Sequence, residues 1–181
     1  MARVPQIASR NDVPEADRHV ADQVVEVFGR IRGPFSILLH SPDLAERLLP
    51  MVPFSRKATV VEGRLRLVGI LATVREKEAD YVWAAQVRVA RDNGVSEASL
   101  NVLRARGPLN ELPADEQEVV QYARQLVLSN RVEQSVFDTL QTKYGTKWLV
   151  ELTAIMSFYG ALSGVVNAFE VAVPDADGDR F

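Results

Sequence analysis

Residues 63–107, GRLRLVGILATVREKEADYVWAAQVRVARDNGVSEASLNVLRARG, decide the fold of this chain. Apolar side chains recur there at spacings of three and four, which is the period of an α-helix. Gly94 ends one apolar run, and Ser96 is a suitable N-cap for the next. Helices are therefore expected at about 63–74, 76–92 and 96–106.

The helical period continues on both sides of this segment, and no stretch alternates as a strand would. The sequence SPDLAERLLP starts a short helix, with Ser41 as cap and Pro42 in the first turn. Other helices are expected at about 14–31, 114–129, 133–144 and 147–170. This pattern predicts an all-α fold of seven or eight helices in one domain, residues 14–173. An extended arm, 1–13, precedes the domain, and an acidic tail, 174–181, is expected to fray.

The composition excludes several classes of function. The chain has 181 residues, 47% of them hydrophobic, and a net charge of −3 with no basic stripe. Nucleic acid and anionic membranes are therefore not expected as partners. The absence of cysteine excludes disulfides, thiolate catalysis and cysteine-bound metal. We expect a cytoplasmic protein that uses neither a metal nor an organic cofactor.

The uncharged segment 152–169, LTAIMSFYGALSGVVNAF, is at the lower limit of length for a membrane span. Ser, Thr and Asn residues dilute it, and Glu151 and Glu170 flank it. We interpret it as a central helix that is buried on most sides. Its remaining apolar surface favours a homo-oligomer.

Gln86 is an unusual residue on an apolar helical face. That face also carries Val82, Trp83, Val87 and Ala90. A buried amide without hydrogen-bond partners costs on the order of 1–3 kcal/mol. Two interpretations stay open: Gln86 orients a ligand, or it is a core amide bonded to a neighbouring backbone group.

The frame RLRLVGIL, YVWAAQ and NGVSEASLNVLR resembles the carboxymuconolactone decarboxylase family, which includes the alkylhydroperoxidase D proteins. GPFSILLHSPDLA at 33–45 and FYGALSGVVNAFEVAVP at 158–174 extend the resemblance over nearly the whole chain. The resemblance implies an all-α fold, small unsaturated lactones or hydroperoxides as substrates, and assembly as trimers or hexamers, with a dimer as a further possibility.

The reactive groups of that family are missing from this chain. The family's glutamate position falls on Leu67, its two cysteine positions fall on Ala79 and Val82, and its histidine position falls on Gln86. An amide keeps the hydrogen bonding of the histidine but cannot exchange a proton near neutral pH. The resemblance thus implies an apolar pocket wall with one amide in it and no thiol peroxidase mechanism.

Further candidate groups come from charge and chemistry. His40 lies at the edge of the resembling motif and is either a pocket residue or a histidine bonded to a backbone carbonyl. Arg64, Arg66 and Arg75 flank an apolar helix. Each could bind a substrate carboxylate through two hydrogen bonds or could simply pair with nearby acids.

Aromatic and polar side chains on two helices complete the set. Tyr81, Trp83 and Tyr159 could line a pocket, although aromatics at helical spacing are more often core residues. Tyr159, Ser163 and Asn167 form a polar seam on one helix face. The residues assigned to catalysis are Gln86, Tyr81, His40 and Tyr159. The residues assigned to substrate binding are Leu67, Val82, Trp83, Arg64, Arg75 and Asn167.

Two functions stay open at this point. One is a cofactor-free enzyme, lyase-like or isomerase-like, that acts on a small organic acid, a lactone or a related intermediate by binding and orientation. The other is a catalytically inactive relative that serves as a small-molecule binding or assembly protein. The loss of all four expected reactive groups favours the second function. The amide that is retained in the pocket favours a protein that binds a ligand.

Overall fold

A computed structural model describes residues 2–173 and 179–181, and within these ranges every secondary-structure element is a helix. The predicted all-α fold is confirmed. The helices are α1 (Arg18–Phe28), α2 (Pro34–Leu38), α3 (Pro42–Leu48), α4 (Met51–Pro53), α5 (Gly63–Glu76), α6 (Asp80–Asp92), α7 (Glu97–Ala105), α8 (Ala114–Ser129), α9 (Gln134–Tyr144) and α10 (Thr146–Ala168). The short helices α2 and α4, and a π-helical turn at Phe54–Ala58, were not anticipated.

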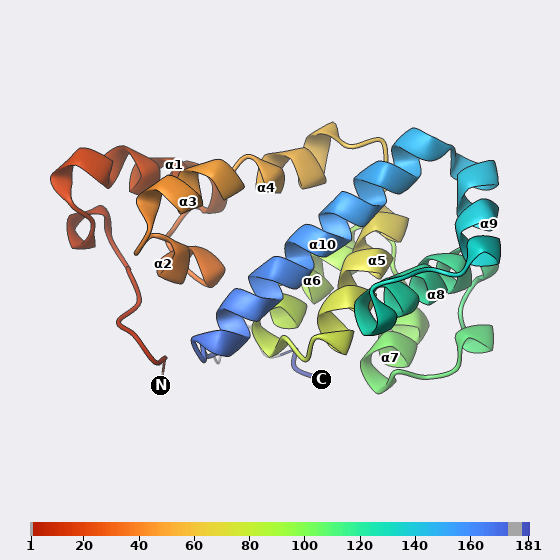
Figure 1. Cartoon of the computed structure of the whole chain (residues 1–181). Helices are drawn as coiled ribbons and strands as arrows, with labels where there is room; N and C mark the ends of the chain where they lie inside the picture. Colours follow the sequence, from red (N-terminus) through yellow and green to blue (C-terminus); the bar gives the residue numbers. More distant parts are fainter. Residues whose placement is uncertain (1, 174–178) are drawn as a thin grey trace.

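Helix α5 forms the centre of the domain, with α6, α8 and α10 packed around it (Figure 1). Every residue from Leu65 to Val74 is buried, which explains why this helix has no polar face. Gly69 permits close approach of α5 to α10: a Cβ added there would lie 3.0 Å from Met156 Sδ and 3.2 Å from Leu152 Cδ1. The backbones of α5 and α10 can pack tightly because this position has no side chain.

Helix α10 is long and apolar enough to cross a membrane by length and composition alone, and half of its most apolar window is buried within the protein. It crosses α5 and contacts α2, α6 and α9 (Figure 1). Its packing supports the prediction of a central core helix. The exposed side of α10 consists largely of small residues, among them Ala154, Ser157, Ala161 and Gly164.

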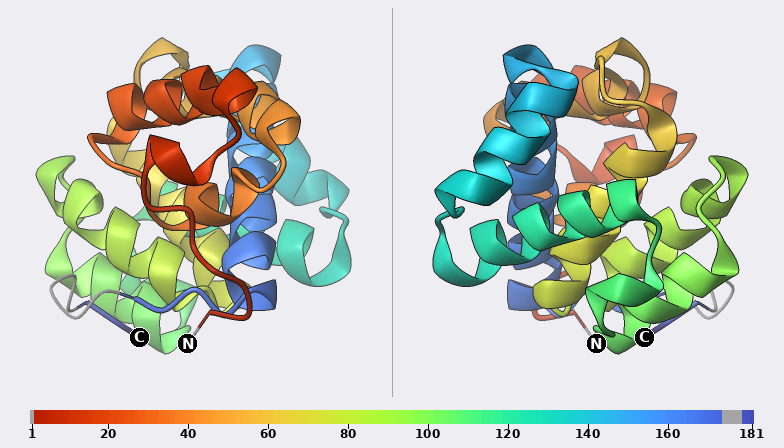
Figure 2. Two further views of the ribbon diagram at one scale, coloured as in Figure 1. Left: turned by 90° about the vertical axis from the view of Figure 1, so that its left-hand side faces the viewer. Right: turned by 90° about the vertical axis from the view of Figure 1, so that its right-hand side faces the viewer.

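The N-terminal helices α1–α4 form a layer over one end of α10 (Figures 1 and 2). The arm that precedes them is held by backbone hydrogen bonds: Ile7 N donates to Ser36 O (2.9 Å), and Arg3 N donates to Phe169 O (3.0 Å). Helix α1 is shorter than predicted. It ends at Phe28 because Gly29 adopts the left-handed conformation, with φ +76°.

The predicted frayed tail, 174–181, falls in two parts. Residues 174–178 lie outside the described residues. Residues 179–181 are in contact with the domain: Asp179 pairs with Arg91, and the Phe181 ring packs against Trp83. The two ends of the chain lie at the same end of the molecule (Figure 2).

Candidate functional site

A pocket of about 160 Å³ lies between the N-terminal layer and the core helices α5, α6 and α10. Its walls are mostly apolar and include Phe28, Phe35, Ile70 and Leu162. The polar side chains that line it are Arg32, Ser55, Arg56, Arg66, Tyr81, Gln86 and Tyr159. Among the described residues, the lining includes three arginines and no carboxylate.

Arg66 is the most deeply placed cation of the pocket. The first turn of α5 holds it, its exposed fraction is 9%, and its Nη1 donates to Val61 O (3.2 Å). Burial lowers the pKa of the Arg66 guanidinium from its ordinary value, and Tyr159 and Glu62 partly offset this effect. The group nevertheless stays protonated at neutral pH. Arg66 forms no ion pair with any described residue, so its charge is available to an anionic ligand.

Two further arginines reach the pocket from the N-terminal layer. Arg56, from the π-helical turn, has its guanidinium carbon 5.1 Å from the centre of the Phe28 ring. Arg32 precedes α2. Because π-helical turns are frequent at functional sites, the position of Arg56 supports a role in binding.

One wall of the pocket is formed by Leu67 of α5 and by Val82 and Gln86 of α6. This places three of the residues assigned from sequence side by side. The Gln86 side chain is half-buried and forms no hydrogen bond with a described residue. Its amide can therefore bond a ligand without losing an existing partner, which favours orientation of a ligand over the role of a satisfied core amide.

Tyr81 and Tyr159 bring phenol groups to the same pocket, from α6 and α10. Gly33 fixes the place of Tyr81: its φ is +59°, and a Cβ there would lie 2.5 Å from Tyr81 Cε1. Tyr159 is 4% exposed, and its hydroxyl forms no hydrogen bond with a described residue.

Trp83 and Arg75, both assigned to substrate binding, lie outside this pocket. Trp83 is fully buried, and its ring meets Phe181 edge-on at 5.6 Å. Arg75 Nε donates to Arg104 O (2.7 Å), and its guanidinium covers the Phe181 ring at 4.1 Å. Consecutive helix positions differ by about 100°, so Val82 can face the pocket while Trp83 faces away.

Arg64 does not line the pocket either. Its guanidinium forms ion pairs with Asp115 and with Glu116 Oε1 (2.6 Å), which join α5 to α8. The hydrogen bond from Arg64 lowers the pKa of Asp115, and the same bond raises the pKa of Arg64. The structure thus gives Arg64 a role in helix packing instead of carboxylate binding.

His40 and Asn167 do not line the pocket either. His40 is exposed, and its Nε2 lies 2.8 Å from the carbonyl oxygen of Pro5. This matches the alternative that the histidine bonds a backbone carbonyl. Asn167 Nδ2 donates to Lys77 O (2.8 Å), so its amide fixes the turn between α5 and α6.

Phe28, Arg32, Ser55 and Arg56 also line the pocket and were not considered from sequence. These four come from short N-terminal elements whose position over α5 no periodicity reveals. Of the arginines on α5, Arg64 and Arg75 were assigned to binding, and the structure places Arg66 at the pocket. Arg66 and Ile70 are four positions apart and share one helix face. Spacing from Leu67 does not favour Arg66 over Arg64, because Arg66 is one position from Leu67 and Arg64 is three. Among the described residues, no group of three or more His, Asp or Glu side chains is placed to hold a metal ion.

Comparison of the fold shows that the chain has the alkylhydroperoxidase D-like fold. A peroxidase-related protein from Ralstonia eutropha JMP134 with an alkylhydroperoxidase core superposes with a TM-score of 0.77 at 17% identity, covering 97% of this chain and 94% of that one. A cysteine-to-alanine variant of the debrominase Bmp8, solved with 2,3,4-tribromopyrrole, gives 0.75 at 15% identity, covering 98% and 96%.

A protein of unknown function from Agrobacterium tumefaciens that carries the AhpD name gives a TM-score of 0.65 at 14% identity, covering 79% of this chain and 99% of that one. At these identities the likeness concerns the fold. No protein-family model and no curated protein matches the sequence.

Proposed function

We propose that this chain binds a small organic acid in the pocket, with the acid's carboxylate against Arg66, and acts on it without a thiol. One observation supports this most strongly: a buried guanidinium that forms no ion pair with described residues opens into a mostly apolar pocket, and no described carboxylate lines that pocket. A desolvated arginine is best satisfied by a planar anion that accepts two hydrogen bonds. Gln86 offers an additional amide for orientation.

The volume of the pocket limits the size of the ligand. About 160 Å³ is below the roughly 300–1,000 Å³ that drug-sized ligands occupy. A single ring with one carboxylate is therefore the expected scale. The debrominase with the same fold was solved with 2,3,4-tribromopyrrole, which is also a single-ring compound.

The chemistry we propose is a lyase or isomerase reaction directed by the carboxylate. Arg66 would hold the acid and stabilise negative charge that develops on it. Tyr81 and Tyr159 supply hydroxyl groups that can give or accept a proton at a neighbouring carbon or oxygen atom. Such a site relies on orientation and charge stabilisation, because neither His40 nor any cysteine lies at the pocket.

A second candidate is a binding protein without catalysis. The observation that favours it is the chemistry of the pocket wall: Leu67, Val82 and Gln86 stand at positions where the resembling family has reactive groups. Ala79 stands at the fourth such position and is buried outside the pocket lining. Binding of an acid is common to both candidates, and turnover separates them.

The test is a matched panel of single-ring acids with their amides and alcohols, titrated into the protein by calorimetry. Acids should bind at least tenfold more tightly than their neutral counterparts. Each acid that binds is then incubated with the protein and followed by NMR. A new product supports the enzyme, binding without a product supports the binding protein, and equal binding of acids and amides contradicts the proposal.

Gln86→Leu should keep the fold and weaken acid binding by about tenfold, since one hydrogen bond is worth about 1–2 kcal/mol. Leucine is similar in size and removes a polar group that has no bond to a described residue. Calorimetry gives the affinity, and thermal unfolding by circular dichroism gives the stability. Unchanged affinity for every acid that binds would show that the amide does not contact the ligand.

We predict no thiol-dependent peroxidase activity, because the chain contains no cysteine to attack a peroxide. The measurement is consumption of an organic hydroperoxide in the presence of a dithiol, with heat-inactivated protein as control. Turnover that a point substitution in this chain abolishes would contradict the prediction.

We also propose a cytoplasmic homo-oligomer, a trimer or hexamer or else a dimer, assembled through the exposed face of α10. Val150 on that face is 60% exposed, and Ala154, Ser157 and Ala161 continue it at spacings of four and three. Light scattering at micromolar concentration should give a multiple of 20.1 kDa. Ala161→Arg should lower that mass, whereas a monomeric mass for the unaltered chain would refute the proposal.

A further inference from the structure

The last described residues, Asp179 to Phe181, occupy a surface that is separate from the acid-binding pocket. This surface, here called the tail site, consists of Arg75, Trp83, Arg91 and Arg104 from the helices α5, α6 and α7. None of these four residues lines the pocket. A role of the tail site is therefore independent of acid binding in the pocket.

The Phe181 side chain is held by an aromatic and a cationic group. Its ring meets Trp83 edge-on at 5.6 Å with an interplanar angle of 84°. The guanidinium carbon of Arg75 lies 4.1 Å from the centre of the same ring, on its face. Edge-to-face packing and a cation over the ring face both favour an aromatic side chain over an aliphatic one.

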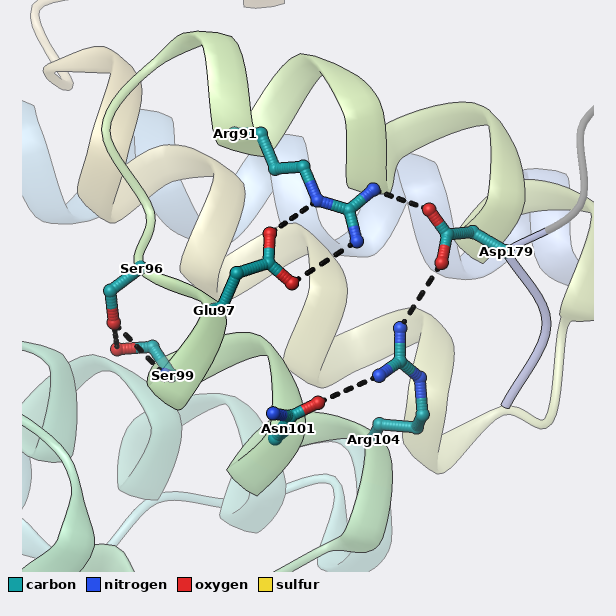
Figure 3. Close-up of polar contacts among 7 residues, drawn as sticks. All are labelled: Arg91, Ser96, Glu97, Ser99, Asn101, Arg104 and Asp179. Atoms are coloured by element: carbon teal, nitrogen blue, oxygen red, sulfur yellow. Dashed lines mark hydrogen bonds and ion pairs between the residues drawn. The ribbon is translucent and has the colours of Figure 1, made fainter.

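The Asp179 carboxylate lies between two arginines (Figure 3). Arg91 Nη1 pairs with Asp179 Oδ2, and Arg104 Nη2 donates to Oδ1 at 3.3 Å. Glu97 orients Arg91 from the other side, with Nε donating to Glu97 Oε1 at 2.5 Å. Asn101 accepts from Arg104 Nη1 at 2.8 Å. Glu97 and Asn101 of α7 thus hold the two guanidinium groups through contacts that do not involve Asp179.

The middle residue of the tail makes its described hydrogen bond to a residue outside the tail site. Arg180 Nη2 donates to Val173 O (3.2 Å), and the side chain is exposed. The contacts therefore select an acidic residue and an aromatic residue two positions later. They are also partly open to water: the exposed fractions are 34% for Arg91, 28% for Arg104 and 35% for Asp179. Partly exposed ion pairs are weakened by salt and exchange readily.

We propose that the tail site is a peptide-binding site for an Asp-x-Phe sequence and that residues 179–181 are its releasable intramolecular ligand. A separate peptide with this sequence competes with the attached tail, which has the advantage of a high effective concentration. The site becomes available to the separate peptide when the tail loses its two recognised side chains.

The experiment uses the full chain with the double substitution Asp179→Ala and Phe181→Ala. The probe is a fluorescein-labelled, C-terminally amidated peptide DADGDRF, and binding is measured by anisotropy. The peptide should bind the double variant at least tenfold more tightly than the unaltered chain. Replacing phenylalanine by alanine in the peptide should remove binding. Equal binding to both proteins, or binding to neither, would overturn the proposal.

Two further variants make the result specific. Arg180→Ala changes a tail residue outside the recognition contacts and should leave the tail docked, so it should behave as the unaltered chain. Arg104→Met in the double variant should remove peptide binding, with circular dichroism as the check of folding. If the double variant does not fold, Asp179→Ala alone should bind the peptide measurably more tightly than Arg180→Ala does, and equal affinities would overturn the proposal.

Discussion

Arg66→Met is expected to weaken acid binding by about tenfold to a hundredfold. A hydrogen bond to a charged group contributes about 1.5–3 kcal/mol, and about 1.4 kcal/mol corresponds to a factor of ten in Kd. Methionine fills a similar volume, and the lost guanidinium leaves no described carboxylate without its partner. The domain should therefore keep its fold, and the loss should appear in calorimetric titration of an acid from the panel.

Two variants control for this result. Arg88→Met removes one positive charge from an exposed position on α6 that does not line the pocket, and it should leave the affinity unchanged. Arg66→Lys keeps the charge but loses the planar pair of donors, so its affinity for the acid should lie between those of Arg66→Met and the unaltered chain. An equal loss in Arg88→Met would mean that net charge, and not this site, attracts the acid.

Because arginine stays protonated, the affinity for the acid should also be constant between about pH 6 and pH 9.

Arg64→Met should act on stability instead of binding. Glu116 is 2% exposed, and Arg64 is its ion-pair partner, so the substitution leaves a buried carboxylate uncompensated. Removing one partner of a buried pair costs about 3–5 kcal/mol, and the partial exposure of Arg64 lowers the expected loss to about 2–4 kcal/mol. Denaturant unfolding gives the value. Acid affinity at a temperature where the variant is folded should be unchanged.

The pH dependence of stability tests the same contact. The hydrogen bond from Arg64 lowers the pKa of Asp115 in the folded state below its usual value of 3.8. A lowered folded pKa contributes stability above the unfolded pKa, and this contribution is lost as pH falls through the folded pKa. The unaltered chain should therefore lose stability below about pH 4. The Arg64→Met variant should lose less stability as the pH falls below this value. Identical pH profiles of stability for the two proteins would contradict the role of Arg64.

The contrast between Arg64 and Arg66 shows what periodicity can and cannot predict. Residues two positions apart on a helix differ by about 200°, so Arg64 and Arg66 point to different sides of α5. That much is available from sequence, but the helical period does not say which of the two faces the pocket. The partners of Arg64 are more than fifty residues away in α8, and no local pattern identifies them.

The difference between local patterns and contacts of distant segments also explains which other parts of the site are predictable from sequence. Helices α5 to α10 and the wall formed by Leu67, Val82 and Gln86 follow from repeated spacing and from the resembling motifs. Arg56 lies in a π-helical turn, which has no clear signature in composition. The docking of Phe181 on Trp83 depends on a contact between distant segments, and an acidic sequence alone predicts a solvated tail.

The central claim is that a carboxylate binds at Arg66. A crystal structure of the protein with 4-bromobenzoate tests it most directly, because the anomalous signal of bromine marks the ligand's position and orientation. The account predicts a carboxylate within hydrogen-bond distance of Arg66 in the pocket, with the brominated ring against Leu67 and Val82. Bromine at any other place on the molecule, with the pocket free of ligand, would contradict it.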